Sequence, residues 1–438
     1  MNERQTTAGM MRFVDLAPSP FHAAAEVATR LEAAGFAELA ELDAWRAPGP
    51  GGGRFFVRRA GSLVAWRVPP GDARAAGSPA APRGFRVVAA HTDSPNLRIK
   101  ARPSMGRAGV RQLGVEVYGG VLLNSWLDRD LGLSGRVIVR AGDGTETRLL
   151  RVDRPLLRVP QLAIHLDRTV NTKGLVLNPQ EHLNPVWGLG AVDEARFERF
   201  LATELGVEAT EILSWDVMCH DVQPSALVGL DAEFVSAPRL DNLCSSFCGL
   251  EALLAHEPGE HVPMLCLFDH EEVGSTSATG AGSPVLKDVM ERVVALAGGG
   301  REDLQRALAA SFCASVDMAH ATHPNWPGKH DPRHWIEVNG GPVIKINTNQ
   351  RYATDAEGEA LFQRACERAG VPVQKYFHRG DLGCGSTIGP ITAASLGLRT
   401  VDVGNPQWAM HSIREMCGSR DPALLVGALT EFFQDPTA

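Results

Sequence analysis

Short apolar runs recur along this chain, and their length and surroundings limit the folds that are open to it. They lack the alternation of polar and apolar residues that a half-exposed strand shows, and this is typical of strands covered on both faces. Polar or glycine-containing segments bound the runs, which are Phe85–Ala90, Val262–Phe268, Phe312–Val316 and Leu398–Val403.

Stretches with the apolar spacing of helices alternate with these runs. In one of them Leu240, Leu243, Phe247 and Leu250 recur at intervals of three and four residues, which places them on one helix face. The expected helices are Phe21–Ala34, Leu240–Ala255, Arg301–Ala310, Ala356–Ala369 and Pro422–Phe433. Together with the apolar runs, they predict an α/β fold with a mostly parallel central sheet flanked by helices.

The 438 residues exceed what one hydrophobic core usually serves, so a second domain or a large insertion is expected. We predict a catalytic domain formed by residues 1–102 and 232–438, with a β-rich domain inserted over residues 103–231. The β-type runs of that insertion are Val115–Tyr118, Arg136–Val139, Arg148–Val152 and Ser225–Leu230. Gly-, Pro- and Ala-rich loops at Pro48–Gly53 and Pro69–Pro82 are expected to enclose a strand-like piece, Arg54–Arg67.

Composition argues against several classes of partner. The net charge is −8 with a pI near 6.0, and there is no basic run, so we expect no nucleic-acid partner. Residues 1–17 lack the apolar core of a signal peptide, and the apolar runs are too short to cross a bilayer, so no membrane association is expected. The eight cysteines include no Cys-x-x-Cys pair, which favours a reducing, cytoplasmic location.

Residues that bind metals follow each apolar run. His91-Thr92-Asp93 follows the first, Asp269-His270-Glu271-Glu272 the second, Asp317 the third, and His411 lies a short loop beyond the fourth. Asp241 would occupy the first turn of the helix at Leu240–Ala255. Because ligands bind outside the carboxyl ends of the strands in α/β sheets, these side chains are expected to face one cavity.

The charges of this set suit two zinc ions. Taking His91, Asp241, Glu272, Asp317 and His411 as ligands, three carboxylates and one hydroxide carry −4, which two Zn²⁺ ions neutralise. Glu271 is then available as the general base, and Asp93 as the partner that orients His91. Each residue alone also fits a structural role: His91 and Asp93 as a hydrogen-bonded pair, the acidic quartet as a solvated turn, Asp241 as a helix N-cap and His411 as a partly buried histidine.

These motifs and others resemble those of the aspartyl aminopeptidase-like family of dinuclear zinc aminopeptidases, over nearly the whole chain. The stretches that carry the resemblance are AAHTDSPNLRIK from Ala89, YGGVLLNSWLDRDLGLSGRV from Tyr118, QLAIHLDR from Gln161, RLDNLCSSFCGL from Arg239, DHEEVGS from Asp269, SVDMAHATHPN from Ser315, GPVIKINTNQRYAT from Gly341, CGSTIGPI from Cys384 and MHS from Met410.

The resemblance implies a zinc peptidase fold and two zinc ions per subunit, with cobalt or manganese as possible substitutes. His91 and Asp317 would hold one ion and Glu272 and His411 the other, with Asp241 bridging them and followed by a cis peptide bond. Glu271 would be the base. The implied reaction removes single N-terminal residues, expected to be Asp or Glu, from peptides with a free N-terminus through a metal-activated water.

The resemblance also implies residues that bind the substrate. His320 would lie near the scissile carbonyl, and Lys345 and Tyr352 would line the substrate pocket, where the lysine favours an acidic side chain. A solvated strand lysine is the alternative for Lys345. His165 would reach the active site of a neighbouring subunit, although a surface histidine is equally open. Members of the family form closed homo-oligomers, commonly dodecamers, through the β-rich insertion, which would act as an oligomerisation and lid domain.

Two rival functions remain open from the sequence. A carboxypeptidase or an amino-acid deacylase of related fold would use the same order of ligands on a different substrate. A non-catalytic binding or assembly protein is the other possibility, although such proteins usually lose ligands and all are present here.

Overall fold

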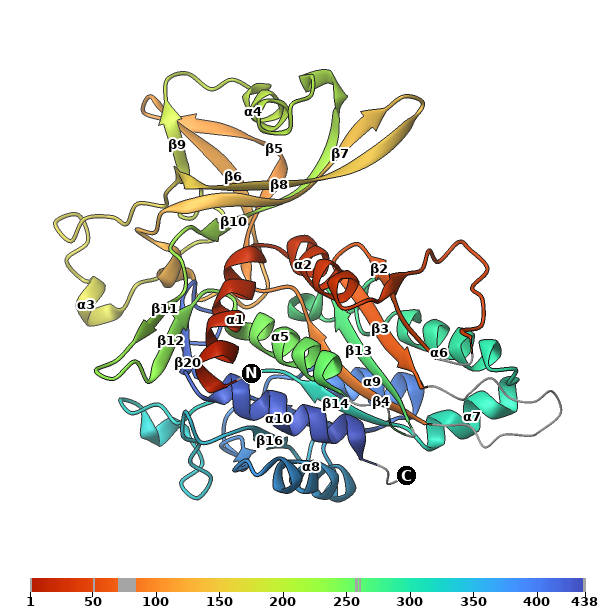
Figure 1. Ribbon diagram of the computed structural model, residues 1–438. Helices are drawn as coiled ribbons and strands as arrows, with labels where there is room; N and C mark the ends of the chain where they lie inside the picture. The colour runs from red at the N-terminus through yellow and green to blue at the C-terminus, as the bar shows by residue number, and fades with distance from the viewer. Residues whose placement is uncertain (1, 50–51, 70–83, 257–258, 260, 436–438) are drawn as a thin grey trace.

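A nine-stranded mixed sheet forms the centre of the larger part of the molecule (Figure 1). The computed structural model describes residues 2–49, 52–69, 84–256, 259 and 261–435, so most of the expected loop Pro69–Pro82 and residues 50 and 51 lie outside the described residues. Across the sheet, the strands are β1 (Ala37–Glu38), β2 (Gly53–Arg59), β3 (Ser62–Val68), β13 (Val262–Phe268), β4 (Phe85–His91), β14 (Phe312–Val316), β18 (Arg399–Gly404), β16 (Val343–Ile346) and β17 (Gln374–Phe377).

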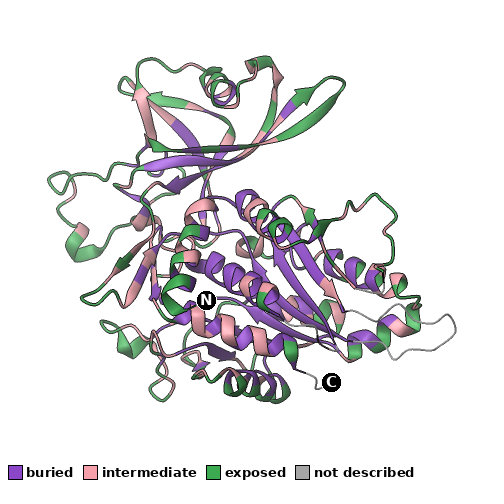
Figure 2. Cartoon of the chain, in the orientation of Figure 1, coloured by how far each residue is buried: buried purple, intermediate pink, exposed green. Residues whose placement is uncertain are grey.

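The four predicted apolar runs are the adjacent parallel strands β13, β4, β14 and β18 at the middle of this sheet. All residues of β13, β4 and β14 are buried, as Figure 2 shows, and so are those of β18 except Arg399. The α/β class is therefore confirmed, while antiparallel β3 and β16 make the whole sheet mixed. The expected single piece Arg54–Arg67 is instead an antiparallel hairpin of β2 and β3, because the chain reverses at Ala60, whose φ of 54° is left-handed, and Gly61.

Helices cover both faces of the sheet, and alternate residues of each strand point to opposite faces. In β4, Val88 and Ala90 belong to one core cluster, whereas Val87 and Ala89 belong to another. The first cluster is closed by α1 (Glu3–Leu16), α2 (Pro20–Ala33), α5 (Leu240–Ala255), α8 (Ala356–Ala369) and α10 (Asp421–Gln434). The second is closed by α6 (Val285–Leu296), α7 (Arg301–Ala309) and α9 (Ile388–Leu396).

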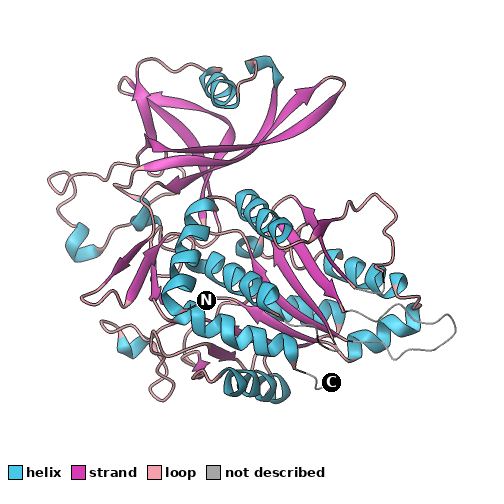
Figure 3. Ribbon diagram, in the orientation of Figure 1, coloured by secondary structure: helices cyan, strands magenta, loops and turns pink. Residues whose placement is uncertain are grey.

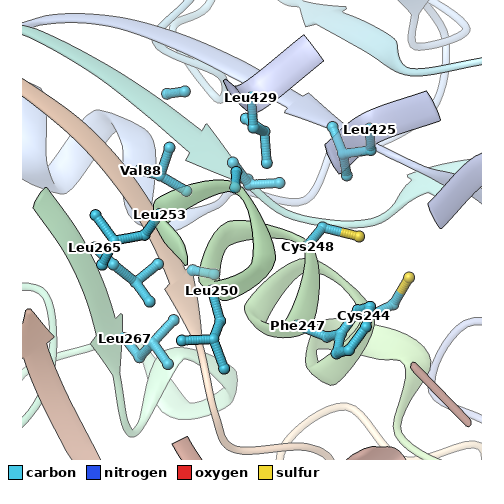
Figure 4. Packing of buried hydrophobic residues seen from close by; sticks show 14 of the residues in the cluster. Val88, Cys244, Phe247, Cys248, Leu250, Leu253, Leu265, Leu267, Leu425 and Leu429 are labelled. Carbon is cyan, nitrogen blue, oxygen red and sulfur yellow. The ribbon is translucent and has the colours of Figure 1, made fainter. Parts of the chain in front are cut away.

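Helix α5 lies at the centre of the first cluster. Figure 4 shows Phe247, Leu250 and Leu253 of α5 among side chains of β4, β13 and α10. Burying each such side chain contributes roughly 1.5–3 kcal/mol relative to exposing it. This packing fixes the amino end of α5, where Asp241 lies, against the carboxyl ends of the parallel strands.

A second, wholly antiparallel sheet stands beside the helix-covered sheet (Figure 3). Its order is β8 (Gly144–Leu157), β7 (Leu131–Ala141), β10 (Ile212–Asp221), β5 (Asn96–Arg107), β6 (Val110–Tyr118) and β9 (Val186–Leu189). It has its own core, to which α4 (Arg196–Leu205) contributes Phe197 and Leu201. A long excursion between β8 and β9 carries the short helix α3 (Val170–Lys173).

A small third sheet joins distant parts of the chain. Its order is β11 (Ala226–Val228), β12 (Phe234–Ala237), β20 (Glu415–Gly418), β19 (Pro406–Trp408) and β15 (Ala319–His320). The run Ser225–Leu230, expected among the strands of the insertion, therefore pairs through β11 with β12 rather than with the six-stranded sheet. Short 3-10 turns occupy Leu123–Trp126, Ala209–Glu211, Glu271–Val273 and Pro327–Lys329. Within the described ranges, no helix has both the length and the apolar character needed to cross a bilayer.

Candidate metal centre

The structure gathers most of the predicted site residues around one cavity of about 490 Å³. The cavity opens at the carboxyl ends of β4, β13 and β14, as the position of the motifs predicts. Its lining includes His91, Asp241, Glu271, Glu272, Asp317, His320, Lys345, Tyr352 and His411. Of the remaining predicted residues, Asp93 lies buried directly beneath the cavity, and His165 lies outside it on the exposed excursion after β8.

Asp241 lies between two histidines that come from distant parts of the chain. Its Oδ1 is 3.4 Å from Nε2 of His91, and its Oδ2 is 3.4 Å from Nε2 of His411. The main chain of Asp241 is not helical, and its peptide bond to Asn242 is cis, as the resemblance implied. Oδ1 of Asp241 accepts no hydrogen bond from the described residues and its Oδ2 faces His411, so its side chain does not cap α5. Both oxygens of one buried carboxylate thus face different imidazoles.

One further carboxylate accompanies each histidine. Asp317 Oδ1 lies 3.6 Å from Nε2 of His91, and Glu272 Oε2 lies 3.4 Å from Nε2 of His411. The ligand atoms of His91, Asp241 and Glu272 all lie within 4.8 Å of one another, and they form the one such group of three among the described residues. His91 with Asp317, and His411 with Glu272, therefore lie on either side of the Asp241 carboxylate.

Main-chain carbonyls set the tautomers of both imidazoles. Nδ1 of His91 lies 3.0 Å from the carbonyl oxygen of Asp93, and Nδ1 of His411 lies 3.0 Å from that of Gly120. Because a carbonyl oxygen only accepts, each Nδ1 donates its hydrogen, which leaves Nε2 of each ring as the nitrogen that faces the carboxylates and would bind a metal. This is how metal-binding histidines are usually oriented in proteins.

The electrostatics of the carboxylates fit a bound dication. Asp241 Oδ1 and Glu272 Oε1 are buried and accept no hydrogen bond from the described residues. Burial, together with the neighbouring Asp241 carboxylate, raises the pKa of Glu272 well above its usual range. Zinc accepts nitrogen and oxygen ligands of this kind and would compensate the negative charges, so the residues present fit the metal.

Asp93 holds the main chain of Glu271 and Glu272 in place. Its two carboxylate oxygens accept the main-chain N–H groups of Glu271 and Glu272, both at 3.1 Å. Nδ1 of His91 lies 3.4 Å from the Asp93 carboxylate, farther than from the Asp93 carbonyl. The carboxylate of Asp93 therefore holds the turn after β13 at least as directly as it holds the imidazole.

Lys345 and its neighbours form one wall of the cavity. Lys345 is only 2% exposed, so it is not a solvated strand lysine. Its Nζ donates to Asp317 Oδ2 and to the carbonyl oxygen of Met318, both at 3.3 Å, and lies 5.2 Å from the centre of the Tyr352 ring. Burial and the charge of Lys345 lower the pKa of His320 to about 4, which keeps this imidazole neutral near pH 7.

Three residues in contact with the predicted set carried no assigned role in the sequence. Tyr118 donates to Asp93, the Gly120 carbonyl accepts from His411, and Glu415 accepts the main-chain N–H groups of Asp241 and His411. Tyr118 and Gly120 are the first and third residues of the YGG motif, and Glu415 follows His411 by four residues. Position in or near a motif was the available signal, because Asp93, His411 and Asp241 are remote in sequence from Tyr118, Gly120 and Glu415, respectively.

Comparison with known proteins decides the family. The model of the family described as aminopeptidase I zinc metalloprotease (M18) matches residues 13–433. The chain belongs to the M18 family. It is 51% identical over 437 residues to the probable M18 family aminopeptidase 2 of Streptomyces coelicolor, covering 99% of this chain and 98% of the relative. The protein of the same name from Mycobacterium tuberculosis strain H37Rv is 52% identical over 435 residues, with 98% of each chain covered.

Solved M18 structures share the fold over nearly the whole chain. The chain from the Ape4 and Nbr1 complex is 36% identical with a TM-score of 0.92, covering 99% of this chain and 86% of that one. The S. cerevisiae mApe1 dodecamer is 29% identical with a TM-score of 0.84, covering 99% and 97%. Family and fold are thus confirmed, and the M18 protein is an aminopeptidase of a zinc metalloprotease family.

Proposed function

We propose that this M18 protein is a dinuclear zinc aminopeptidase that removes single acidic residues, Asp or Glu, from the N-termini of peptides. The observation that carries the proposal is the shared carboxylate of Asp241, whose two oxygens each face the Nε2 atom of a different histidine inside one cavity. His91 and Asp317 would hold one ion, Glu272 and His411 the other, and Asp241 would bridge them. Cobalt or manganese would suit the same nitrogen and oxygen ligands.

Bound zinc supplies a Lewis acid for the scissile carbonyl oxygen and lowers the pKa of water. The protein's own part centres on Glu271, whose Oε2 lies 3.9 Å from Nε2 of His91 at the edge of the cavity. Burial and the nearby Asp317 carboxylate raise the pKa of Glu271 to about 7. A carboxyl group in that range both accepts and returns a proton at neutral pH, so Glu271 is proposed to take a proton from water and pass it to the leaving amine.

The wall formed by His320, Lys345 and Tyr352 is proposed to bind the first residue of the peptide. The neutral imidazole of His320 is able to donate a hydrogen bond to the carbonyl that is cleaved. The ammonium group of Lys345 is buried beside Asp317, so an acidic substrate side chain would share a cation that is already inside the cavity. Charge-assisted contact of this kind favours Asp or Glu over a neutral residue.

Residues 103–231, which hold most of the six-stranded sheet, are proposed as an inserted oligomerisation and lid domain, although β5 of that sheet begins before them, at Asn96. His165 is exposed, and large apolar side chains around it, Leu162, Ile164 and Leu166, are exposed as well. Such a segment is a candidate for covering by a second copy. We propose a homo-oligomer, a dodecamer by analogy with the mApe1 relative, in which His165 reaches the neighbouring subunit's cavity. The eight free cysteines support a cytoplasmic location.

The decisive experiment is hydrolysis of chromogenic Asp-amide and Leu-amide by the purified protein, before and after chelation. Cleavage of Asp-amide alone, abolished by the chelator and restored by zinc, is expected. Preference for Leu-amide would keep the aminopeptidase and reject the acidic pocket. An N-acetylated Asp-amide is the matched control: release of its chromophore at an equal rate would show that no free N-terminus is required and would reject the aminopeptidase. Release of acetate with the chromogenic amide left intact would favour the related deacylase.

A further inference from the structure

Glu415 is a buried carboxylate that contacts two of the proposed metal ligands through their main chain. Its Oε2 accepts the N–H of Asp241 at 2.9 Å, and its Oε1 accepts the N–H of His411 at 2.8 Å. The side chain is 2% exposed, and Glu415 begins β20, where it pairs with Ala237 of β12, the strand that leads into α5. One side chain therefore ties the loop before β20 to the start of α5.

Both N–H groups belong to irregular backbone. Asp241 has φ −80° and ψ 105°, outside the helix that follows it, and His411 has a left-handed φ of 66°. A histidine in the left-handed region is strained and persists only where its surroundings hold it. Because neither N–H is used within a helix or a strand ladder, Glu415 supplies the acceptor that each would otherwise lack.

The side chains of the same two residues point into the cavity. Asp241 Oδ2 and Nε2 of His411 lie 3.4 Å apart, and both residues line the cavity. A shift of either main chain would change the separation of these two atoms directly. Since a dinuclear site tolerates little change in ligand geometry, whatever fixes both backbones also fixes the site.

Resting on the function proposed above, we propose that Glu415 is a positioning residue of the metal centre, which sets the distance between the bridging Asp241 and the ligand His411 by accepting both of their main-chain hydrogen bonds. It contacts neither substrate nor metal in this arrangement. Gln407, whose Nε2 lies 3.5 Å from Glu415 Oε1, is the one further hydrogen-bond partner of its carboxylate among the described residues.

The test uses Glu415→Gln in the full-length protein. The amide keeps the shape of the side chain but replaces one acceptor with an NH₂ group that faces an N–H, so one of the two hydrogen bonds is lost. Glu251→Gln is the matched control, because Glu251 is a largely buried carboxylate on the same helix as Asp241 that pairs with Arg30 instead of lying at the cavity.

Zinc affinity is measured by competition with a chromophoric chelator, alongside kcat and KM for the better of the two aminoacyl amides. We expect Glu415→Gln to bind zinc about 10–100-fold more weakly and to lose kcat by a similar factor, with KM nearly unchanged. Glu251→Gln should match the wild type. Wild-type zinc affinity and kcat in Glu415→Gln would overturn the proposal.

Thermal unfolding with and without zinc separates positioning from a general loss of stability. Positioning predicts that Glu415→Gln lowers Tm more with zinc than without it, because the variant loses part of the stabilisation that the metal provides. An equal loss of Tm in both conditions, with unchanged zinc affinity, would make Glu415 purely structural and reject the inference. If Glu415→Gln does not fold, Glu415→Asp, which keeps both oxygens on a shorter arm, is expected to show the same zinc-dependent pattern.

The wild type separately reports on the function on which the inference rests. Zinc binding without cleavage of either amide would reject the proposed peptidase, while the difference between the variants would still decide the role of Glu415. A wild type that binds no zinc would reject both.

Discussion

The hydroxyl oxygen of Tyr118 lies 2.6 Å from Asp93 Oδ2 and donates a hydrogen bond to it. Tyr118 ends β6 in the six-stranded sheet, whereas Asp93 follows β4 in the central sheet. The same carboxylate accepts the main-chain N–H groups of Glu271 and Glu272. Through Tyr118, the antiparallel sheet contacts Asp93, the buried residue that holds the main chain of the proposed base Glu271 and of the proposed ligand Glu272.

Removing the hydroxyl should therefore weaken the site without unfolding the sheet. Tyr118→Phe keeps the ring on which the Arg98 guanidinium stacks at 3.9 Å. Loss of one hydrogen bond to a charged group should lower the free energy of unfolding by about 1.5–3 kcal/mol. If the same free energy were lost from the transition state, kcat would fall by about 10–100-fold, and we expect no larger loss. Denaturant unfolding and steady-state kinetics measure the two effects. Unchanged kcat in a folded variant would show that Asp93 does not need this donor.

The contrast between predicted and unexpected residues has a physical cause. His91 ends β4, Asp317 directly follows β14, and Glu272 lies in the turn after β13. These strands are recognisable from their own apolar composition, so the shared edge of a parallel sheet predicted that the three residues lie close together. Tyr118 and Glu415 act through contacts between elements far apart in the chain, and local pattern does not encode which strand ends meet.

Lys345 shows what the alternation of residues along a strand does not predict. Alternation along β16 places Lys345 on the face opposite to Ile344 and Ile346, but periodicity does not tell whether water or a cavity lies there. The structure buries it against Asp317 and Tyr352. Likewise, the apolar content of Arg54–Arg67 predicts one strand-like piece, whereas the chain reverses at Gly61 and at Ala60, which adopts a left-handed conformation.

Glu271 offers the sharpest test of the proposed chemistry. Glu271→Gln removes the proton acceptor but no proposed ligand, so kcat should fall about 10²–10⁴-fold while zinc content stays at the wild-type value. Elemental analysis and kinetics on the same preparation measure both. Glu272→Gln is the matched comparison, in which zinc affinity should fall as well. Activity within tenfold of the wild type in Glu271→Gln would exclude it as the base.

A buried histidine on α2 should make the protein sensitive to acid. Nδ1 of His22 lies within hydrogen-bond distance, 2.7 Å, of the Ser19 hydroxyl oxygen. Burial and the nearby charge of Arg151 lower the pKa of His22 from 6.5 to about 4. Because the folded-state pKa is depressed, the neutral ring stabilises the fold above pH 6.5, and this contribution is lost as the pH falls toward 4, by up to roughly 3 kcal/mol. His22→Gln should therefore lose less stability than the wild type between pH 7 and pH 5 in denaturant unfolding. His182→Gln, at a half-exposed position, is the control, and identical pH profiles for all three would contradict the role of His22.

Variants around His165 distinguish its proposed part in catalysis from the assembly of the oligomer. Ile164→Asp together with Leu166→Asp places two charges on the exposed apolar segment and should yield smaller species with at least tenfold lower activity per subunit, measured by mass photometry and kinetics. His165→Ala should keep the assembly of the wild type but lose activity, because only the reaching side chain is removed. A stable monomer with full turnover would eliminate any contribution from a neighbouring subunit.

Specificity for acidic residues depends on Lys345, and a ratio of rates isolates it. Lys345→Met removes the ammonium group, and the loss of one charge-assisted hydrogen bond should lower kcat/KM for Asp-amide by about 10–100-fold. The substitution also frees Asp317 of its partner, which would affect every substrate alike. The Leu-amide rate therefore serves as the internal reference, and it should fall by no more than a few-fold. Lys345→Arg keeps the charge and should retain part of the preference. If both amides lost activity equally in Lys345→Met, the lysine would serve the metal centre through Asp317, and the first side chain of the substrate would be selected elsewhere in the cavity.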